Sequence, residues 1–171
     1  LAGNHMMSTR NVGVRVPATI GDLMTRQTVI TNLRATSKPQ LLAELAGRAM
    51  PATKIDRLQI FRALLDREAV VSTGLGMGAA IPNARFKGLR TPFALFIRLA
   101  WPIDYNALDG RPVDLLRLLL GPDPANDAYL NILVSASRAL RDPTVRDRLR
   151  SGADPRTVFA DLGESAATQS S

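Results

Sequence analysis

Apolar residues recur along the N-terminal half of the chain at the three- and four-residue spacing typical of helices. This spacing predicts a helix over residues 39–50, with Ser37 as its N-cap and Pro39 in its first turn. Pro51 is expected to interrupt the helix, and a second helix is expected to follow. The side chains expected on the buried face of the second helix are Ile55, Leu58, Phe61, Leu64 and Leu65.

Shorter apolar runs predict strands. The alternation in TVITNL, residues 28–33, and the apolar run FALFIRL, residues 93–99, each indicate one strand. Periodicity alone allows VDLLRLLL, residues 113–120, to be a strand or a helix. Its flanking glycines, Gly110 and Gly121, each accompanied by a proline, favour a strand.

Helical spacing returns in the C-terminal third of the chain. A long helix is expected from about Asn126 to Leu140, and two short helices should start at Asp142-Pro143 and Asp154-Pro155. The long helix is expected to bury Tyr129, Leu130, Leu133, Ala136, Ser137 and Leu140. Strands interleaved with helices predict an α/β fold with a central mixed β-sheet flanked by helices on both faces.

The chain has 171 residues, 46% of them hydrophobic, as expected for one domain with a real core. We expect residues 1–16 to be an expression scar and mobile arm, 17–163 to be the domain, and 164–171 to be a disordered tail. The segment LAGNHM looks like the scar. It holds His5, the single histidine, so the native protein is expected to have none.

Composition narrows the chemistry further. The chain has no cysteine and no apolar run near the roughly 20 residues of a membrane helix, so we expect a cytoplasmic protein without membrane insertion. A missing histidine argues against metal-dependent hydrolysis and Ser-His-Asp catalysis, and no cofactor or metal is expected. The net charge of +7 favours acidic partners. Scattered arginines and few aromatic residues do not favour nucleic acid, which would show as steeply salt-dependent binding to any duplex.

The segment GLGMGA, residues 74–79, fits the dinucleotide pattern G-x-G-x-x-G/A only weakly. That mechanism needs a helix after the glycines, where Pro82 stands, and an acidic residue about 20 positions on. No acid occurs between Glu68 and Asp104, so the loop is expected in positive potential. A positive potential at the loop has two possible interpretations. The loop could be a surface that binds an acidic or phosphorylated partner, or its arginines could simply be solvated, and composition alone favours the second interpretation.

Other polar residues have ordinary structural interpretations. Arg67 and Glu68 at the end of the second helix are expected to pair or to cap carbonyl groups. The spacing of Asp104, Asp109 and Asp114 suits turns and strand edges better than paired-carboxylate catalysis. Tyr129 is expected to be half-buried with its hydroxyl at the surface.

Three segments together carry a family resemblance over about residues 20–162: REAVVSTGLGMGAAIPNARFKGL, PIDYNALDGRPVDLLRLLLGP and LNILVSASRALRDPTVRDRL. They resemble the type-2 (mannitol/fructose class) enzyme IIA domains of the bacterial sugar phosphotransferase system, nearest the nitrogen-regulatory branch. The resemblance implies that Asn83 stands where the family has the histidine that accepts phosphate from the histidine phosphocarrier protein. It also matches Tyr129 to a second family histidine and Arg67 to the arginine that helps hold the phosphoryl group.

The chemistry of Asn83 decides what this resemblance implies for function. An imidazole nitrogen has a free lone pair that can attack phosphorus, whereas the amide nitrogen of asparagine has its lone pair delocalised. We therefore expect a regulatory pseudoenzyme, fixed in a dephospho-like state, that binds a protein partner. The surface expected to bind a partner or an anion comprises Ser72, Thr73, Gly74, Gly76, Gly78, Pro82, Arg85 and Lys87.

The resemblance names three kinds of partner: the histidine phosphocarrier, a potassium transporter or a sensor kinase. Two further functions stay open. The chain could be an active phosphocarrier through a non-histidine acceptor such as Ser72 or Asp104. It could instead sense phosphate or a phosphometabolite, with backbone N–H groups of the glycine loop beside Arg67 as the anion site. Loss of both family histidines favours natural divergence over an engineered inactivation.

Overall fold

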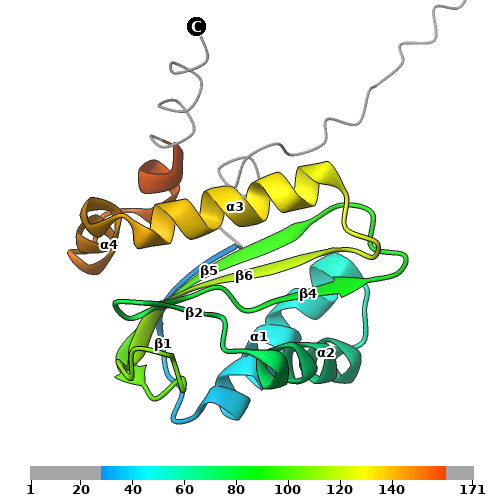
Figure 1. The fold of residues 1–171 in the computed structure, drawn as a ribbon, viewed down its shortest axis with the longest axis horizontal. Coiled ribbons are helices and arrows are strands. Elements are labelled where there is room, and N and C mark those ends of the chain that lie inside the picture. Colours follow the sequence, from blue (N-terminus) through cyan, green and yellow to red (C-terminus); the bar gives the residue numbers. More distant parts are fainter. Residues whose placement is uncertain (1–27, 161–171) are drawn as a thin grey trace, which may run out of the picture.

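The computed structural model describes residues 28–160, which form one mixed sheet between two layers of helices (Figure 1). The predictions for the N-terminal arm and the C-terminal tail lie outside this range. The strands are β1 (Val29–Leu33), β2 (Gly74–Gly76), β3 (Ala79–Ala80), β4 (Asn83–Phe86), β5 (Phe93–Ile103) and β6 (Val113–Pro122). The helices are α1 (Lys38–Thr53), α2 (Arg57–Val70), α3 (Asp127–Arg141) and α4 (Pro143–Arg150). Residues 155–160 are also helical.

The sheet has the strand order β1-β5-β6-β3-β2, and β4 also pairs with β6. Strand β5 runs antiparallel to β6 and parallel to β1, whereas β3 and β4 run parallel to β6. The run VDLLRLLL is therefore a strand, as its flanking residues predicted. This strand, β6, pairs with three others: β3, β4 and β5.

Strands β3 and β4 are two pieces of one path along β6, interrupted at Ile81-Pro82. Strand β3 pairs with Leu115 and Leu116, and β4 pairs with the segment from Leu119 to Pro122. At the interruption the N–H of Ile81 donates to the carbonyl of Thr73 at 3.0 Å, and the carbonyl of Pro82 accepts from Leu119 at 3.0 Å. Proline has no N–H to give to a ladder, so the break falls there and Asn83 begins the new strand.

Two hydrophobic cores lie on the two faces of the sheet. One packs β-strand side chains such as Ile97 and Leu116 against α1 and α2, and the other packs Phe96 and Leu119 against α3 and α4. Figure 1 shows the same division, with α1 and α2 below the sheet and α3 above it. The predicted α/β fold with helices on both faces is confirmed.

Three details of the sequence predictions are wrong, one in each of α1, α2 and α3. Helix α1 continues through Pro51 to Thr53, because near the end of a helix proline removes only one of the last hydrogen bonds. In α2 Leu58 is 50% exposed and Ile60 is buried with Leu64. In α3 Leu130 is exposed, and Ile132 and Ala139 take part in the buried face instead. Local spacing marks an apolar stripe, but only packing decides which side of the stripe faces the sheet.

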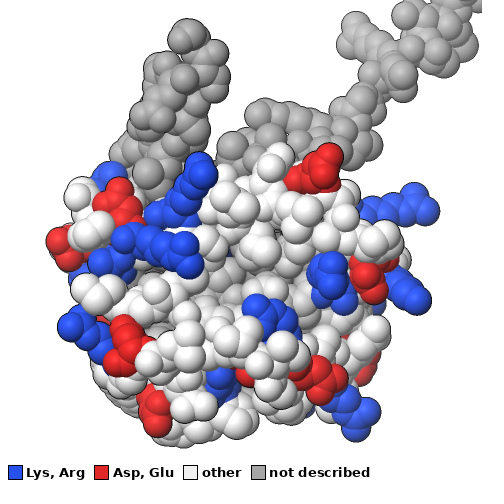
Figure 2. Space-filling view, in the orientation of Figure 1, with Lys and Arg blue, Asp and Glu red and all other residues white. Residues whose placement is uncertain are grey.

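The glycine segment forms a tight hairpin, β2 to β3, and no helix follows it. This excludes the dinucleotide-binding geometry, which needs a helix N-terminus at the glycines. Within residues 28–160 no helix is both long and apolar enough to cross a membrane. Basic side chains are spread over the face seen in Figure 2 between acidic ones, which agrees with the scattered charge of the sequence.

Candidate functional site

Asn83 is the first residue of β4, directly after the break at Ile81-Pro82. Its side chain is half-buried, and its Nδ2 donates a hydrogen bond of 2.8 Å to the carbonyl of Ile81. The amide thereby folds back over the break in the strand. One N–H and the amide oxygen stay available for another group.

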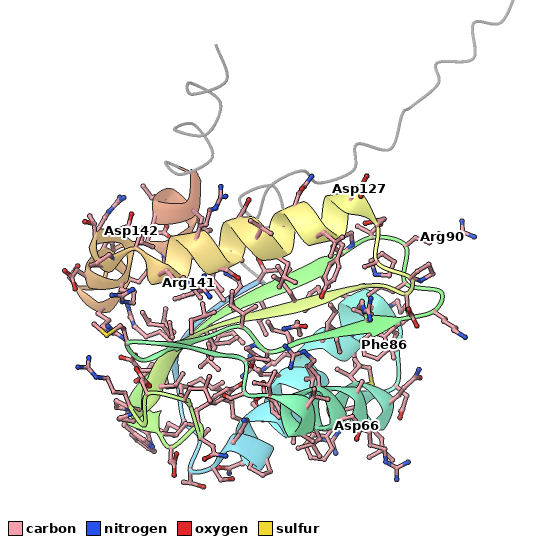
Figure 3. The ribbon with its side chains drawn as sticks, viewed as in Figure 1. Asp66, Phe86, Arg90, Asp127, Arg141 and Asp142 are labelled. Carbon is pink, nitrogen blue, oxygen red and sulfur yellow. The ribbon has the colours of Figure 1, made fainter. Side chains whose placement is uncertain are left out.

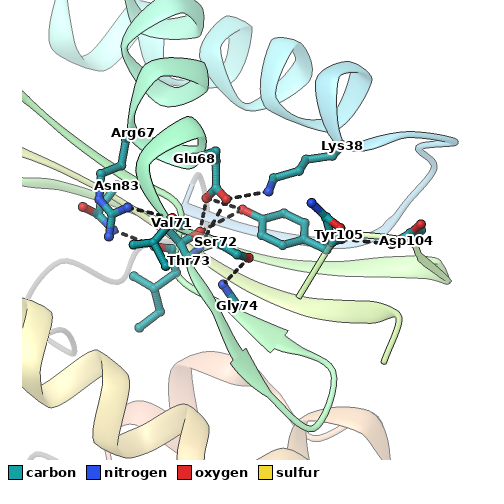
Figure 4. Close-up of polar contacts among 12 residues, drawn as sticks. Lys38, Arg67, Glu68, Val71, Ser72, Thr73, Gly74, Asn83, Asp104 and Tyr105 are labelled. Atoms are coloured by element: carbon teal, nitrogen blue, oxygen red, sulfur yellow. Dashed lines mark hydrogen bonds and ion pairs between the residues drawn. The ribbon is translucent and has the colours of Figure 1, made fainter. Parts of the chain in front are cut away.

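Arg67 approaches Asn83 from the last turn of α2 (Figure 4). Its Nη1 donates to the carbonyl of Val71 at 2.9 Å, one residue past the end of the helix. The predicted carbonyl-capping role of Arg67 is confirmed. This bond holds the guanidinium beside the asparagine and leaves other N–H donors of the group unused.

Arg67 and Asn83 stand together with Leu133 between two cavities under α3. The larger cavity has a volume of about 450 Å³ and is also lined by Arg85, Asp123 and Tyr129. The smaller cavity has a volume of about 260 Å³; its remaining lining residues are Ser72, Thr73, Gly74, Leu75, Ile81, Ser137 and Arg141. Two of the three positions matched by the resemblance, Arg67 and Asn83, therefore meet at the centre of one groove, and the third, Tyr129, lines its larger cavity.

Tyr129 lies deeper than predicted. The residue is 1% exposed, and its hydroxyl makes no hydrogen bond with any residue that the structure describes. The ring lies against Gly121, where an added Cβ would come within 2.2 Å of Tyr129 Cδ2. The expectation of a hydroxyl at the surface is wrong, because a residue without a side chain at position 121 lets the ring sink onto β6.

Burial also changes the acidity of this hydroxyl. Removal from water raises the pKa of Tyr129 to about 12, since the phenolate is disfavoured in an apolar site. The positive charges of Arg85 and Arg67 oppose this rise in pKa. Both arginines line the same cavity as Tyr129, and the hydroxyl is protonated at neutral pH.

Glu68 anchors the segment that leads from α2 into the groove (Figure 4). Its carboxylate accepts hydrogen bonds from Thr73 N at 3.2 Å, from the Thr73 hydroxyl and from Tyr105 OH at 2.9 Å. Lys38 Nζ lies 2.6 Å from Glu68 Oε2, and the ammonium group sits over the Tyr105 ring. Among the described residues, Glu68 pairs with these groups and not with its neighbour Arg67, and the carboxylate holds Thr73 in place.

The tip of the glycine hairpin lies outside both cavities. Gly76, Gly78 and Lys87 do not line them. The N–H of Met77 donates to Asp109 at 2.9 Å, and Arg150 bonds both Asp114 and the carbonyl of Met77. Residues 69–103 contain no acidic residue, but the fold brings the carboxylates of Asp109 and Asp114 to the tip of the hairpin. The expectation of a positive potential at the loop did not take these distant carboxylates into account.

Two N–H groups of the glycine loop, those of Gly74 and Met77, already make hydrogen bonds. Gly74 N donates to Ser72 Oγ at 3.1 Å, while Met77 N is held by Asp109. An anion site built on these backbone donors therefore has few left. Asp104 lies in the turn after β5, where its carboxylate accepts from Asn106 N, and it lines neither cavity.

The sequence analysis did not single out Arg141 or Asp123, which line the groove. The sequence spacing could have indicated that Arg141 lies near the groove. It follows Tyr129, Leu133 and Ser137 at successive four-residue intervals, so it lies on the same side of α3. In Figure 3 its label lies at the end of α3 above the hairpin. Asp123 had no local signal, because it lies in the connection between β6 and α3.

The chain belongs to the family of EIIA 2 domains of the phosphoenolpyruvate-dependent sugar phosphotransferase system, whose model matches residues 22–164. It is similar to nitrogen regulatory proteins within that family. The protein of Bradyrhizobium diazoefficiens is 38% identical over 149 residues, which are 87% of this chain and 97% of the relative.

Other relatives agree. The nitrogen regulatory protein of Pseudomonas aeruginosa is 38% identical over 76% of this chain and 85% of its own length. The crystal structure of nitrogen regulatory protein IIA-Ntr from Neisseria meningitidis superposes with a TM-score of 0.78 at 29% identity, covering 84% of this chain and 98% of that one. A complex of mannitol enzyme IIA with phosphorylated enzyme IIB from Escherichia coli shares the fold, with a TM-score of 0.66 at 17% identity over 82% of this chain and 97% of that one.

Proposed function

We infer that this nitrogen-regulatory enzyme IIA-like protein acts by binding a protein partner and does not carry phosphate at Asn83. The observation that supports this inference is the identity of the side chain at the centre of the groove, Asn83. At position 83 the structure holds a carboxamide, bonded to the carbonyl of Ile81, beside Arg67. A carboxamide supplies hydrogen-bond donors and an acceptor but no nucleophilic lone pair on nitrogen.

The second position matched to a family histidine supports the same inference. Tyr129 is buried with its hydroxyl protonated at neutral pH, so it offers no phenolate to attack phosphorus. Among the alternative acceptors, only Ser72 lines the groove, and its Oγ accepts a hydrogen bond from Gly74 N. Within residues 28–160 no general base lies among the bonded partners of Ser72.

The partner surface that we propose is the rim of the groove. On α3 Leu130 and Val134 are 46% and 50% exposed, and Leu130 itself lines the larger cavity. Arg85 and Arg141 flank these apolar side chains from opposite ends of the groove. A partner that fits this rim has an apolar contact surrounded by carboxylates.

The partner is expected among three kinds of protein: the histidine phosphocarrier, a transporter or a sensor kinase. The mannitol enzyme IIA of Escherichia coli forms a complex with phosphorylated enzyme IIB. We propose a cytoplasmic location and a domain that spans residues 17–163; the family match to residues 22–164 supports that extent.

The test is phosphotransfer from phosphorylated histidine phosphocarrier to the full chain, read as a phosphate adduct by intact mass. We expect no adduct on the native chain and an acid-labile adduct on Asn83→His, because an imidazole beside Arg67 regains the nucleophile. Asn83→Gln is the matched control, since it changes the same position without adding a nucleophile, and it should stay unmodified.

A stoichiometric adduct on the native chain would overturn the proposal, and peptide mapping would then place it on Ser72, Asp104 or another residue. If Asn83→His also stays unmodified, its binding to the phosphocarrier is measured by calorimetry. Binding without transfer would leave the docking role intact, and an absence of binding would remove the phosphocarrier from the list of partners.

A further inference from the structure

A continuous series of hydrogen bonds runs from the end of α2 to the side chain of Asn83. The Glu68 carboxylate accepts from the backbone N–H of Thr73 at 3.2 Å and also from the Thr73 hydroxyl. The carbonyl of Thr73 accepts from the N–H of Ile81 at 3.0 Å. The carbonyl of Ile81 in turn accepts from Nδ2 of Asn83 at 2.8 Å. Glu68, Thr73 and Asn83 are seen together in Figure 4.

Thr73 is held tightly at the middle of this series. It is 6% exposed although its side chain is polar. Its hydroxyl lies 3.0 Å from the hydroxyl of Tyr105, which itself donates to Glu68 at 2.9 Å. Lys38 Nζ stands 2.6 Å from the second oxygen of the carboxylate. Both oxygens of Glu68 therefore face donors, and the carboxylate cannot turn away from Thr73 without leaving buried donors without an acceptor.

The bond between Ile81 and Thr73 lies where the sheet is interrupted. Pairing with β6 stops at Ala80 and resumes at Asn83, because Pro82 has no N–H to donate. Between these two points the N–H of Ile81 bonds to Thr73. Thr73 therefore holds the peptide of Ile81 in place where the ladder does not.

The last bond of the series fixes which way the Asn83 carboxamide faces. Its NH₂ group lies against the carbonyl of Ile81, and the reverse orientation would bring two oxygens that only accept hydrogen bonds together. The amide oxygen therefore faces away from that carbonyl and stays available as an acceptor. Arg67 lines the same two cavities as Asn83 and supplies donors there.

We propose that Thr73 is a positioning residue that fixes, through Ile81, the orientation of the Asn83 carboxamide. Glu68 keeps Thr73 in place for this role, and the amide oxygen of Asn83 is the group presented to the partner. An acceptor beside the donors of Arg67 fits a partner group that has a donor and an acceptor side by side, as a carboxamide or a peptide unit does. This inference deepens the proposed function and rests on it for the presence of a partner.

The first test is NMR of the ¹⁵N-labelled full chain, with the side-chain NH₂ signals of Asn83 identified by their loss in Asn83→Asp. Thr73→Val removes the hydroxyl and keeps a branched side chain. We expect it to shift both NH₂ signals and to speed hydrogen exchange of the bonded N–H about 5-fold or more, as for the loss of one net hydrogen bond. Thr73→Ser keeps the hydroxyl and should hold exchange within about 2-fold of the native rate.

Thr53→Val is the matched control. The Thr53 hydroxyl donates to the carbonyl of Ala49 at 2.9 Å, and Thr53 ends α1, outside the lining of both cavities of the groove. This variant also loses a hydroxyl hydrogen bond, so it measures the effect of lower stability alone. The NH₂ signals of Asn83 and their exchange should stay native.

A second measurement connects the positioning to function. In the Asn83→His background, an imidazole N–H can bond the same carbonyl of Ile81, and phosphotransfer from the phosphorylated histidine phosphocarrier measures how well the side chain is placed. Thr73→Val should lower kcat about 10-fold and leave KM within about 2-fold, because misplacement slows the transfer step while the docking surface is unchanged. Thr53→Val should leave both constants native.

Native NH₂ signals and native exchange in Thr73→Val would overturn the proposal, and so would equal changes in Thr73→Val and Thr53→Val. If Asn83→His takes up no phosphate, the phosphocarrier is lost as a partner, and the NMR comparison alone then decides the role of Thr73.

Discussion

At the scale of single residues, Gly121 shows how one backbone position sets the depth of a neighbouring side chain. It pairs with Arg85 across the ladder between β4 and β6, and its missing Cβ makes room for the ring of Tyr129. The added carbon of an alanine would meet the ring atoms Cγ, Cδ2 and Cε2 within 2.5 Å, so the ring or the strand would have to shift.

We expect Gly121→Ala to lower the free energy of unfolding by about 1–3 kcal/mol or more, the cost of overpacking a core. Urea unfolding measures this change. Gly47→Ala is the control, because Gly47 lies in α1 and its added Cβ would stand 3.4 Å from Arg57 Cδ, an ordinary contact. That substitution should stabilise by about 0.5–1 kcal/mol through helix propensity. A Gly121→Ala chain as stable as the native one would show that the ring of Tyr129 can move.

At the scale of elements, Glu68 joins four parts of the chain: the starts of α1 and β2, the end of α2 and the loop after β5. Its side chain is 5% exposed and meets Lys38, Thr73 and Tyr105. All of these groups act as donors toward the carboxylate. An amide at this position would turn an NH₂ group toward at least one of these donors.

We expect Glu68→Gln to lower the free energy of unfolding by about 2–3 kcal/mol, because one donor loses its partner and Lys38 loses its counter-ion in a largely buried site. Glu44→Gln is the control, since Glu44 pairs with Arg48 at 3.4 Å on an exposed surface of α1. Its cost should stay within about 0.5 kcal/mol. Equal costs for the two substitutions, measured by urea unfolding, would contradict the structural role of Glu68.

The same elements show where sequence reasoning ends. The starts of α1 and α3 follow from local signals, since Ser37 and Asn126 cap backbone N–H groups within three residues. The partners of Glu68 lie up to 37 residues away, and no local pattern announces them. Position 83 could be assigned through the family resemblance and Arg141 through its spacing on α3, whereas Asp123 became part of the groove only through the path of the connection between β6 and α3.

At the scale of the whole molecule, the two tyrosines of the chain lie in the hydrophobic cores on opposite faces of the sheet. Tyr105 belongs to the core under α1 and α2, and Tyr129 to the core under α3. Burial raises the pKa of Tyr105 well above its usual value and the pKa of Tyr129 to about 12. The negative charge of Glu68 adds to the rise for Tyr105.

Stability should therefore fall at alkaline pH. The unfolded chain releases its phenolic protons near pH 10, before the folded chain does, so each tyrosine favours unfolding as pH rises from 10 toward its folded pKa. For Tyr129 this loss amounts to about 2–3 kcal/mol by pH 12. Urea unfolding as a function of pH measures it, and Tyr129→Phe should flatten the curve between pH 10 and 12.

Phenolate absorbance of the folded chain gives the check on this prediction. Neither tyrosine should ionise near pH 10 while the chain is folded. A phenol that titrates there in the native chain would contradict the burial of that residue, and the Tyr105→Phe and Tyr129→Phe variants would show which face had opened.

The sequence by itself determined the order of the helices and of the longer strands β1, β5 and β6, the glycine-rich segment and the carboxamide at position 83, because these depend on local spacing and on the identity of single residues. The short strands β2, β3 and β4 were not predicted, because their pairing with one another and with β6 depends on the tertiary structure. Only the tertiary structure decided which side chains line the groove. Arg67, Arg85 and Tyr129 come from α2, β4 and α3, and they line one cavity because the sheet brings those elements together. Burial, with the rise in pKa that follows from it, depends on neighbours distant in the chain, and Gly121 beneath the ring of Tyr129 is such a neighbour.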